Sequence, residues 1–107
     1  MFDFYPANPS AYRGFPCTGG KVQYVLSNRD KTEMAFKIAM QTNAHLYTIQ
    51  PATGVIAHLR TIEVEVTRKN GPPGEDAIHA FCVPVEDAKK LDQLEFLYGR
   101  GYTMKSY

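Results

Sequence analysis

The strongest pattern in this sequence is an alternation of apolar and polar side chains with a period of two residues. It is clearest from Thr61 to Thr67, where Ile62, Val64 and Val66 alternate with threonines and glutamates. The run from Glu33 to Met40 alternates in the same way. Because successive side chains of a strand point to opposite faces, each run predicts a strand that buries one face. We therefore expect an all-β chain.

Shorter segments of the same character predict further strands. They lie at Phe2 and Phe4, Lys21–Asn28, Leu46–Gln50, Ala77–Val85 and Gly101–Tyr107. Turns rich in glycine, proline and asparagine separate the strands, at Ser27–Lys31, Gln50–Gly54 and Asn70–Gly74. Seven short strands with frequent turns predict an immunoglobulin-like, seven-stranded β-sandwich, formed by one domain of residues 1–107.

One short helix is predicted before the last strand. Asp87 is a candidate N-cap, and the apolar residues after it recur at helical spacing. Gly99 is placed to terminate the helix, because glycine readily adopts the left-handed conformation that ends many helices. The apolar positions are Ala88, Leu91, Leu94 and Leu97 or Tyr98.

Charge and composition exclude several classes of protein. Lys and Arg number 12 against 11 Asp and Glu, a net charge of +1, whereas a protein that neutralises many phosphates carries a strong positive excess. We therefore expect no nucleic-acid partner. No run of about 18 uncharged apolar residues occurs, so membrane insertion is not expected. The N-terminus lacks the basic and apolar regions of a signal peptide, which predicts a cytoplasmic protein.

Catalytic and metal centres have little support in the sequence. Cys17 and Cys82 lack the close spacing of a zinc or redox motif, and we expect both to be free thiols. His79 and Cys82 are three residues apart on one strand, so they face opposite sides and cannot form a nucleophilic pair. We expect His79 to be partly buried with one nitrogen bonded, and His45 and His58 to lie in loops. The sequence therefore predicts no enzyme, no catalytic residue, no metal and no cofactor.

Several short motifs follow one another in an informative order. A strand, a polar turn and a second strand precede a motif of proline, small residues, glycine and two apolar residues, and an aromatic turn with Gly-x-Gly comes before the last strand. These motifs are Tyr24–Asn28, Ala35–Ile38, Gln50–Ile56 and Phe96–Tyr102. In their order they resemble the major sperm protein (MSP) domain family. Two further segments, Pro16–Gly20 and Gly71–Asp76, are similar to the small nematode sperm-specific proteins of that family.

The resemblance implies an MSP-type sandwich in the cytoplasm that acts through its surface and without catalysis. Members of the family build or regulate the cytoskeleton of crawling nematode sperm. The implied partners are MSP filaments or related sperm cytoskeletal proteins, with this chain as an accessory or structural component. Whether the chain forms a homodimer stays open at this point.

The alternative is a soluble adaptor that binds short peptides across the strand at Lys37 to Asn43. Some relatives capture acidic peptides containing two phenylalanines, the FFAT-like mode. The outward face of Glu33–Met40 carries the small residues Ala35 and Ala39 beside Lys37, so another backbone can approach closely. The candidate protein-binding residues are Lys37, Ala39, Met40, Gln41, Thr42, Asn43 and His79.

Overall fold

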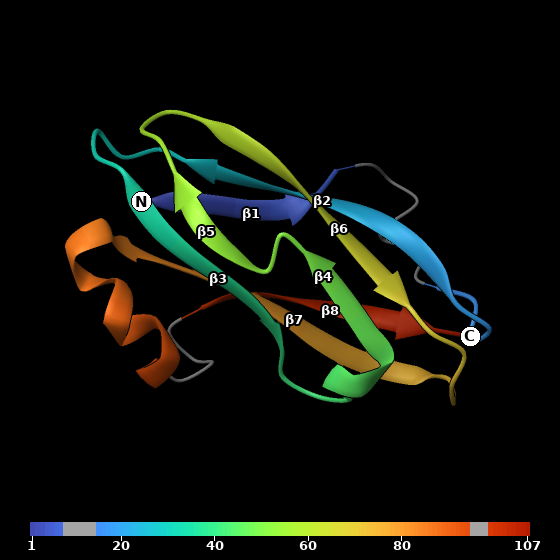
Figure 1. The fold of residues 1–107 in the computed structure, drawn as a ribbon. Coiled ribbons are helices and arrows are strands. Elements are labelled where there is room, and N and C mark those ends of the chain that lie inside the picture. The colour runs from blue at the N-terminus through green and yellow to red at the C-terminus, as the bar shows by residue number, and fades with distance from the viewer. Residues whose placement is uncertain (8–14, 95–98) are drawn as a thin grey trace.

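The structure is a computed structural model that describes residues 1–7, 15–94 and 99–107. These residues form two antiparallel sheets packed face to face, with strand orders β1-β2-β6-β4 and β5-β3-β7-β8 (Figure 1). The strands are β1 Phe2–Pro6, β2 Gly20–Asn28, β3 Met34–Met40, β4 Tyr47–Gln50, β5 Thr53–Ile56, β6 Thr61–Arg68, β7 Gly74–Pro84 and β8 Arg100–Ser106. Two 3₁₀ helices, η1 Ala44–Leu46 and η2 Val85–Gln93, complete the described elements.

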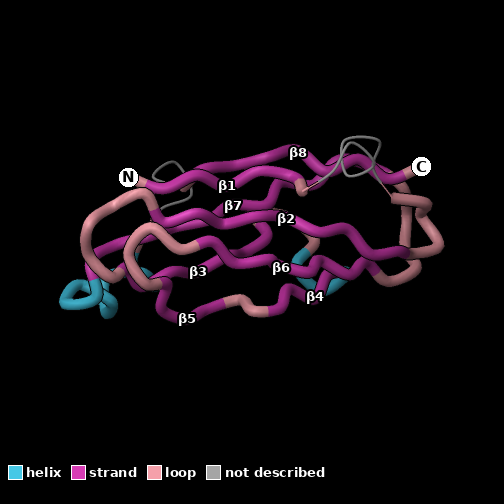
Figure 2. Tube along the Cα trace, turned by 90° about the horizontal axis from the view of Figure 1, so that it is seen from above, coloured by secondary structure: helices cyan, strands magenta, loops and turns pink. Residues whose placement is uncertain are grey.

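The predicted sandwich is confirmed, but the described part of the chain has eight strands instead of seven. The additional strand is β5, which lies partly in the segment predicted as the turn Gln50–Gly54. It pairs with β3, with Ala35 opposite Val55 and Phe36 opposite Gly54. The chain thus leaves the first sheet at the end of β4 and joins the second sheet at Thr53. Figure 2 shows the result, with β5 and β4 in succession along one side of the sandwich and β1 and β8 along the other.

The helix before the last strand is present, but its start and its geometry differ from the prediction. It begins at Val85 with Pro84 at the N-cap position, so Asp87 lies inside it. The described helix ends at Gln93, and the predicted positions Leu97 and Tyr98 lie outside the described residues. Leu91 is buried against Ala35 and Phe81, so η2 covers part of the outer face of the second sheet.

The core lies between the two sheets and follows the predicted alternation. Tyr24 and Leu26 of β2 and Val64 and Val66 of β6 all point inward and are at most 1% exposed. Aromatic rings pack together at the centre, where Phe4 stacks on the Tyr24 ring with centroids 5.0 Å apart. Among the described residues, the buried members of this core cluster are Phe4, Phe15, Tyr24, Leu26, Met34, Phe36, Ile38, Met40, Tyr47, Ile56, Val64, Val66, Ile78, Ala80 and Met104.

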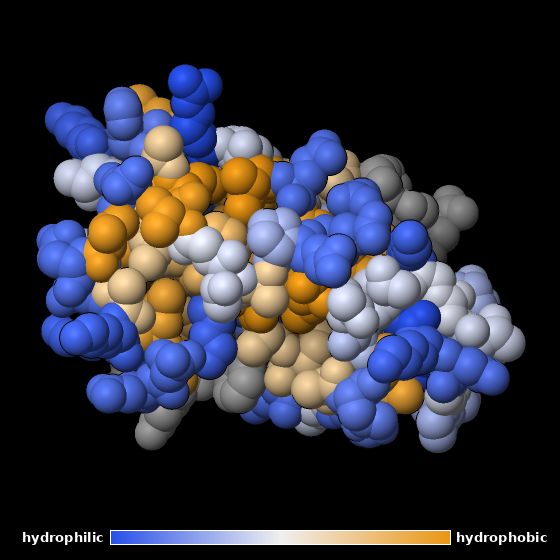
Figure 3. Space-filling view, viewed as in Figure 1, coloured by the Kyte–Doolittle hydropathy of each residue, from blue (hydrophilic) through white to orange (hydrophobic). Residues whose placement is uncertain are grey.

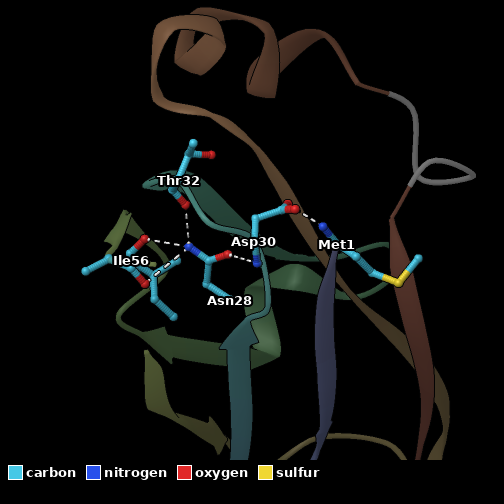
Figure 4. Close-up of polar contacts among 6 residues, drawn as sticks. Met1, Asn28, Asp30, Thr32 and Ile56 are labelled. Carbon is cyan, nitrogen blue, oxygen red and sulfur yellow. Dashed lines mark hydrogen bonds and ion pairs between the residues drawn. The ribbon is translucent and has the colours of Figure 1, made fainter. Parts of the chain in front are cut away.

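A buried asparagine ties two connections together at one end of the sandwich. The Asn28 side chain is 1% exposed. Its amide nitrogen donates to the carbonyl oxygens of Ile56 and Thr32, each at 3.0 Å, and to that of Ala57 at 3.2 Å (Figure 4). Its side-chain oxygen accepts from the backbone N–H of Asp30 at 2.9 Å. One side chain therefore holds both the β2–β3 turn and the end of β5.

We expect the Asn28→Ala substitution to lower the free energy of unfolding by about 2–3 kcal/mol, because it leaves buried carbonyl oxygens without a donor. Chemical denaturation followed by circular dichroism measures this loss. Asn28→Asp keeps the size of the side chain and its acceptor but not the amide donor, so it should be no more stable than the alanine variant. The role given to this amide would be contradicted if the free energy of unfolding of Asn28→Ala lay within about 0.5 kcal/mol of the native value, which is the range of ordinary surface substitutions.

Candidate functional site

The structure brings four of the seven candidate binding residues together on the outer surface of β3 and β7. We call this surface the β3–β7 face. It carries Lys37 and Ala39 of β3, Gln41 just after β3, and His79 of β7. Ala39 and His79 lie directly opposite each other in the strand pairing. The face is thus a shallow surface with a cation at one end, a small residue in the middle and polar groups at the other end.

His79 is held in place by contacts on three sides. Its Nε2 lies 3.0 Å from Oε1 of Gln41, which is a hydrogen bond when that nitrogen carries the proton. Its ring stacks on Phe81 with centroids 6.4 Å apart. A Cβ atom added to Gly101 would lie 2.5 Å from Cε1 of His79, so the ring covers this glycine of β8. The expectation of a partly buried histidine with one nitrogen bonded is confirmed.

Burial lowers the pKa of His79 below its ordinary value of 6.5. The cause is that the partly covered ring loses water, which disfavours the charged imidazolium. The imidazole is therefore neutral near pH 7, and the β3–β7 face has Lys37 as its cationic member at that pH.

Lys37 already has an anionic neighbour within the chain. Its Nζ lies 3.2 Å from Oδ1 of Asp92 in η2, and the two side chains are 31% and 88% exposed. An ion pair this open to solvent contributes little stability, typically below about 1 kcal/mol. A partner carboxylate can therefore compete with Asp92 for Lys37 at small cost.

Ala35 does not belong to the exposed surface that was expected. It is 3% exposed, because η2 and the ring of Phe81 cover it. The prediction that both alanines leave the strand bare is therefore wrong for Ala35. The sequence predicted a helix before the last strand but contained no indication of which sheet face the helix covers.

Three candidate residues lie away from the β3–β7 face. Met40 points into the core and is 7% exposed. Thr42 Oγ1 and Asn43 Nδ2 donate to the same oxygen, Oδ1 of Asp76, at 2.9 and 2.7 Å. Thr42 and Asn43 are exposed residues, but these donor atoms already have a partner within the chain.

Asp76 is the centre of a buried polar cluster that also contains Tyr47 and Arg68. The Tyr47 hydroxyl donates to Oδ2 of Asp76 at 2.7 Å. Arg68 is 2% exposed, and its guanidinium donates to the carbonyl oxygens of Cys17 at 2.7 Å and Pro72 at 2.6 Å. The guanidinium carbon also lies 5.9 Å from the centre of the Tyr47 ring. The cluster thus joins loops and strands of both sheets.

The pKa values in this cluster follow from its contacts. Burial alone would raise the pKa of Asp76, but the hydrogen bonds from Tyr47, Asn43 and Thr42 and the charge of Arg68 outweigh it, so the pKa is lowered. Burial, followed by the hydrogen bond to Asp76, raises the pKa of Tyr47 to about 12. Asp76 is therefore ionised and Tyr47 protonated over the physiological range.

The sequence contains a signal for this cluster in the parity of two charged residues. Arg68 continues the inward-facing series of Val64 and Val66, and Asp76 precedes Ile78 in the same way on β7. A charged residue at a position whose periodicity predicts burial requires a polar partner inside the protein. Two such residues in one chain indicate that they share a buried site.

Cys82 and His79 of β7 lie on opposite faces of the second sheet. Cys82 packs against the inner core while His79 lies outside, so the predicted separation of these two side chains is confirmed. Burial raises the pKa of the Cys82 thiol to about 12, which keeps it protonated, and both cysteines are free thiols.

Within residues 1–7, 15–94 and 99–107, no three His, Cys, Asp or Glu side chains are grouped to hold a metal ion. None of the helices in that same part of the chain is long and apolar enough to cross a membrane.

Comparison with known proteins gives consistent results in sequence and structure. A family model described as the MSP (Major sperm protein) domain matches residues 6–96. The chain is 30% identical over 79 residues to sperm-specific class P protein 34 of Caenorhabditis elegans, which covers 72% of this chain and 73% of that protein.

Solved structures agree with this similarity. SSP-19, an MSP-domain protein like family member in Caenorhabditis elegans, superposes with a TM-score of 0.65 at 25% identity over 86% of this chain and 90% of that one. WR4, a C. elegans MSP family member, has the same fold, with a TM-score of 0.62 at 24% identity over 86% of each chain.

We expect the stability contributed by Asp76 to depend on pH. Its folded pKa lies below the unfolded value, so this stability is complete above about pH 4 and is lost as the pH falls through the folded pKa. Asp76→Asn should therefore be less stable than the native protein by about 2–3 kcal/mol at pH 7, and the difference should shrink at pH near 3. Urea denaturation at both pH values measures it.

The matched control is Glu75→Gln, which changes the exposed neighbour of Asp76 on the same strand. Its effect on unfolding should be small at both pH values, because the Glu75–Lys105 ion pair is solvent-exposed. If the difference in free energy of unfolding between Asp76→Asn and the native protein is the same at both pH values, the pKa of Asp76 is not lowered by folding, which would contradict this prediction.

Proposed function

The chain belongs to the MSP (Major sperm protein) domain family, and we propose that it acts in the cytoplasm of nematode sperm by binding other proteins and not by catalysis. Its role in this proposal is that of an accessory component of the MSP-based cytoskeleton. Class P protein 34 of Caenorhabditis elegans, to which the chain is similar, is named as a sperm-specific protein, which supports the cell type.

The observation that carries the proposal is the composition of the β3–β7 face. Ala39 keeps the surface low beside His79, whose ring lies over Gly101 and is held by Gln41 and Phe81. A low surface with fixed polar groups lets a partner backbone approach closely and costs little conformational entropy on binding. The near-neutral net charge of +1 favours a protein partner over nucleic acid.

We expect the chain to co-sediment with assembled MSP filaments and the Ala39→Arg variant to co-sediment much less. The new side chain projects from the middle of the low surface and blocks a backbone from approaching it. Thr61→Arg is the matched control, since it adds the same side chain at an exposed position of β6 in the other sheet. Thermal unfolding of both variants checks that they fold.

Absence of the native protein from the filament pellet at every salt concentration would reject the cytoskeletal role. Equal binding by Ala39→Arg and the native protein would place the filament contact on another surface and so reject this use of the β3–β7 face.

A second candidate function is the capture of short acidic peptides on the same face. The observation that favours it is Lys37, whose partner Asp92 is 88% exposed and therefore easily replaced by a carboxylate of a bound peptide. Gln41 lies four residues further along the chain, about 13 Å away in an extended strand, so a peptide of a few residues would span the face.

For this second function, we expect Lys37→Glu to weaken binding of an acidic peptide containing two phenylalanines by about tenfold, the effect of losing a favourable charge contact and gaining a repulsive one. Fluorescence anisotropy with a labelled peptide measures the affinity. Asp92→Ala serves as the control, because it also breaks the Lys37–Asp92 pair but leaves the lysine in place; it should bind at least as well as the native protein. Indifference of the affinity to Lys37→Glu would exclude peptide capture at this position.

A further inference from the structure

The outer surface of β3 and β7 continues under the helix η2. Phe81 lies directly opposite Lys37 in the strand pairing, and Val83 lies opposite Ala35. These two pairs extend the β3–β7 face toward the start of η2, where the surface changes from polar to apolar. η2 covers this apolar part, since Ala35, Phe81 and Leu91 form a buried cluster of their own.

The sequence of η2 suits the surface that it covers. A 3₁₀ helix has three residues per turn, so side chains three residues apart lie on one face of it. The residues with this spacing are all apolar, namely Val85, Ala88 and Leu91 of η2 and the following Leu94. Leu91 is buried and Leu94 packs against the same cluster. η2 therefore turns an apolar face toward the sheet.

In the part of the chain that the structure describes, few buried contacts attach η2 to the sheet. Leu91 belongs to the small cluster with Ala35 and Phe81 and not to the main core between the sheets. Asp92 adds an ion pair with Lys37 that is open to solvent. Runs of 3₁₀ helix longer than three or four residues are uncommon, because their hydrogen bonds are poorly aligned, and η2 has nine residues. Because such a segment opens at a lower free energy than the core, η2 can leave the sheet while the sandwich stays folded.

A groove on the β5 side of η2 leads to this covered surface. Its volume is about 280 Å³, and it lies between strands β3 and β5 on one side and Ala88, Leu91 and Asp92 of η2 on the other. Lys37 also lines it, so the groove joins the apolar surface to the cation of the β3–β7 face. In Figure 3, apolar side chains gather over the β3–β5 side of the molecule within a hydrophilic surround, which is typical of contact surfaces. A partner can thus make contact here before η2 moves.

Two neighbouring residues of η2 make the contacts that a bound peptide would make. Leu91 fills the apolar surface against Ala35 and Phe81. The next residue, Asp92, places a carboxylate oxygen 3.2 Å from Nζ of Lys37. An acidic peptide with phenylalanines also presents apolar side chains beside carboxylates. η2 therefore occupies the surface with the same chemistry that such a peptide offers.

We propose that η2 is a built-in competitor of the partner segment. A segment that carries an apolar side chain next to a carboxylate takes the place of Leu91 and Asp92, and η2 leaves the sheet as the segment binds. The free protein has a lower affinity for this reason, because binding must overcome the contacts of η2. The competition rests on the peptide capture proposed above, and it specifies what the partner presents and how its affinity is set.

Fluorescence anisotropy with the labelled acidic peptide tests the competition through the sign of the effect. We expect Leu91→Ser to raise the affinity by about tenfold, the order expected for the loss of one buried leucine contact. Asp92→Ala should raise it by about twofold to threefold, since the ion pair that it removes is open to solvent. Lys89→Ser changes an exposed residue of the same helix and is the matched control, with an unchanged affinity. Thermal unfolding checks that the variants fold.

Hydrogen exchange of the native protein tests the displacement without a substitution. With saturating peptide, the amides of η2, Val85–Gln93, should exchange faster than in the free protein. Those of β6, Thr61–Arg68 in the other sheet, should exchange at the same rate in both states. Unchanged or slower exchange of η2 would overturn the proposal, because a partner that packs onto η2 protects its amides.

The competition and the peptide capture fail in different ways. If the peptide binds and Lys37→Glu weakens it, but Leu91→Ser binds no more tightly than the native protein, peptide capture stands and the competition is rejected. If neither the native protein nor Leu91→Ser binds the peptide, peptide capture is rejected and the competition with it. Binding by Leu91→Ser that exceeds binding by the native protein supports both.

Discussion

Every strand of this sandwich must place each second side chain between the two sheets, and the rest of the structure depends on this requirement. The inward series on β3 consists of Met34, Phe36, Ile38 and Met40. That series leaves Lys37 and Ala39 for the outer surface, where His79 of β7 joins them. A shift of one residue in the register of β3 would exchange the two sets and expose four large apolar side chains. The composition of the β3–β7 face is therefore a direct consequence of core packing.

Two buried polar clusters hold connecting segments of the sandwich, where the alternation of inward and outward side chains does not determine the structure. Asn28 satisfies carbonyl oxygens of the connections at one end, and Asp76 with Tyr47 and Arg68 joins strands and loops of both sheets. Buried groups of this kind are costly unless all partners are present, so they favour one arrangement of the loops over its alternatives. The loop after β3 is held in this way, which positions Gln41 beside His79.

The parts of the fold that could be predicted are those with long periodic runs, such as β3 and β6. β5 could not be, because four residues that follow a proline and include a glycine are typical of a turn, and only pairing with β3 makes them a strand. The candidate site also combines features that periodicity predicts with features that depend on packing. The outward position of Lys37 follows from strand parity. β7 has apolar residues at both parities, so the outward position of His79, like the burial of Ala35, depends on how the second sheet and η2 pack. Thr42 and Asn43 lie in a loop, where no periodicity applies, and their contact with Asp76 spans 34 and 33 residues of sequence.

The passage of the chain from one sheet to the other between β4 and β5 limits what can be built on that side of the molecule. Each sheet has only a four-residue border there, Tyr47–Gln50 in one and Thr53–Ile56 in the other. A strand added along β5 reaches the end of its template after about 13 Å, and continuing would require it to change sheets as the chain itself does. A strand attached on this side can therefore pair with only about four residues before the border passes to the other sheet.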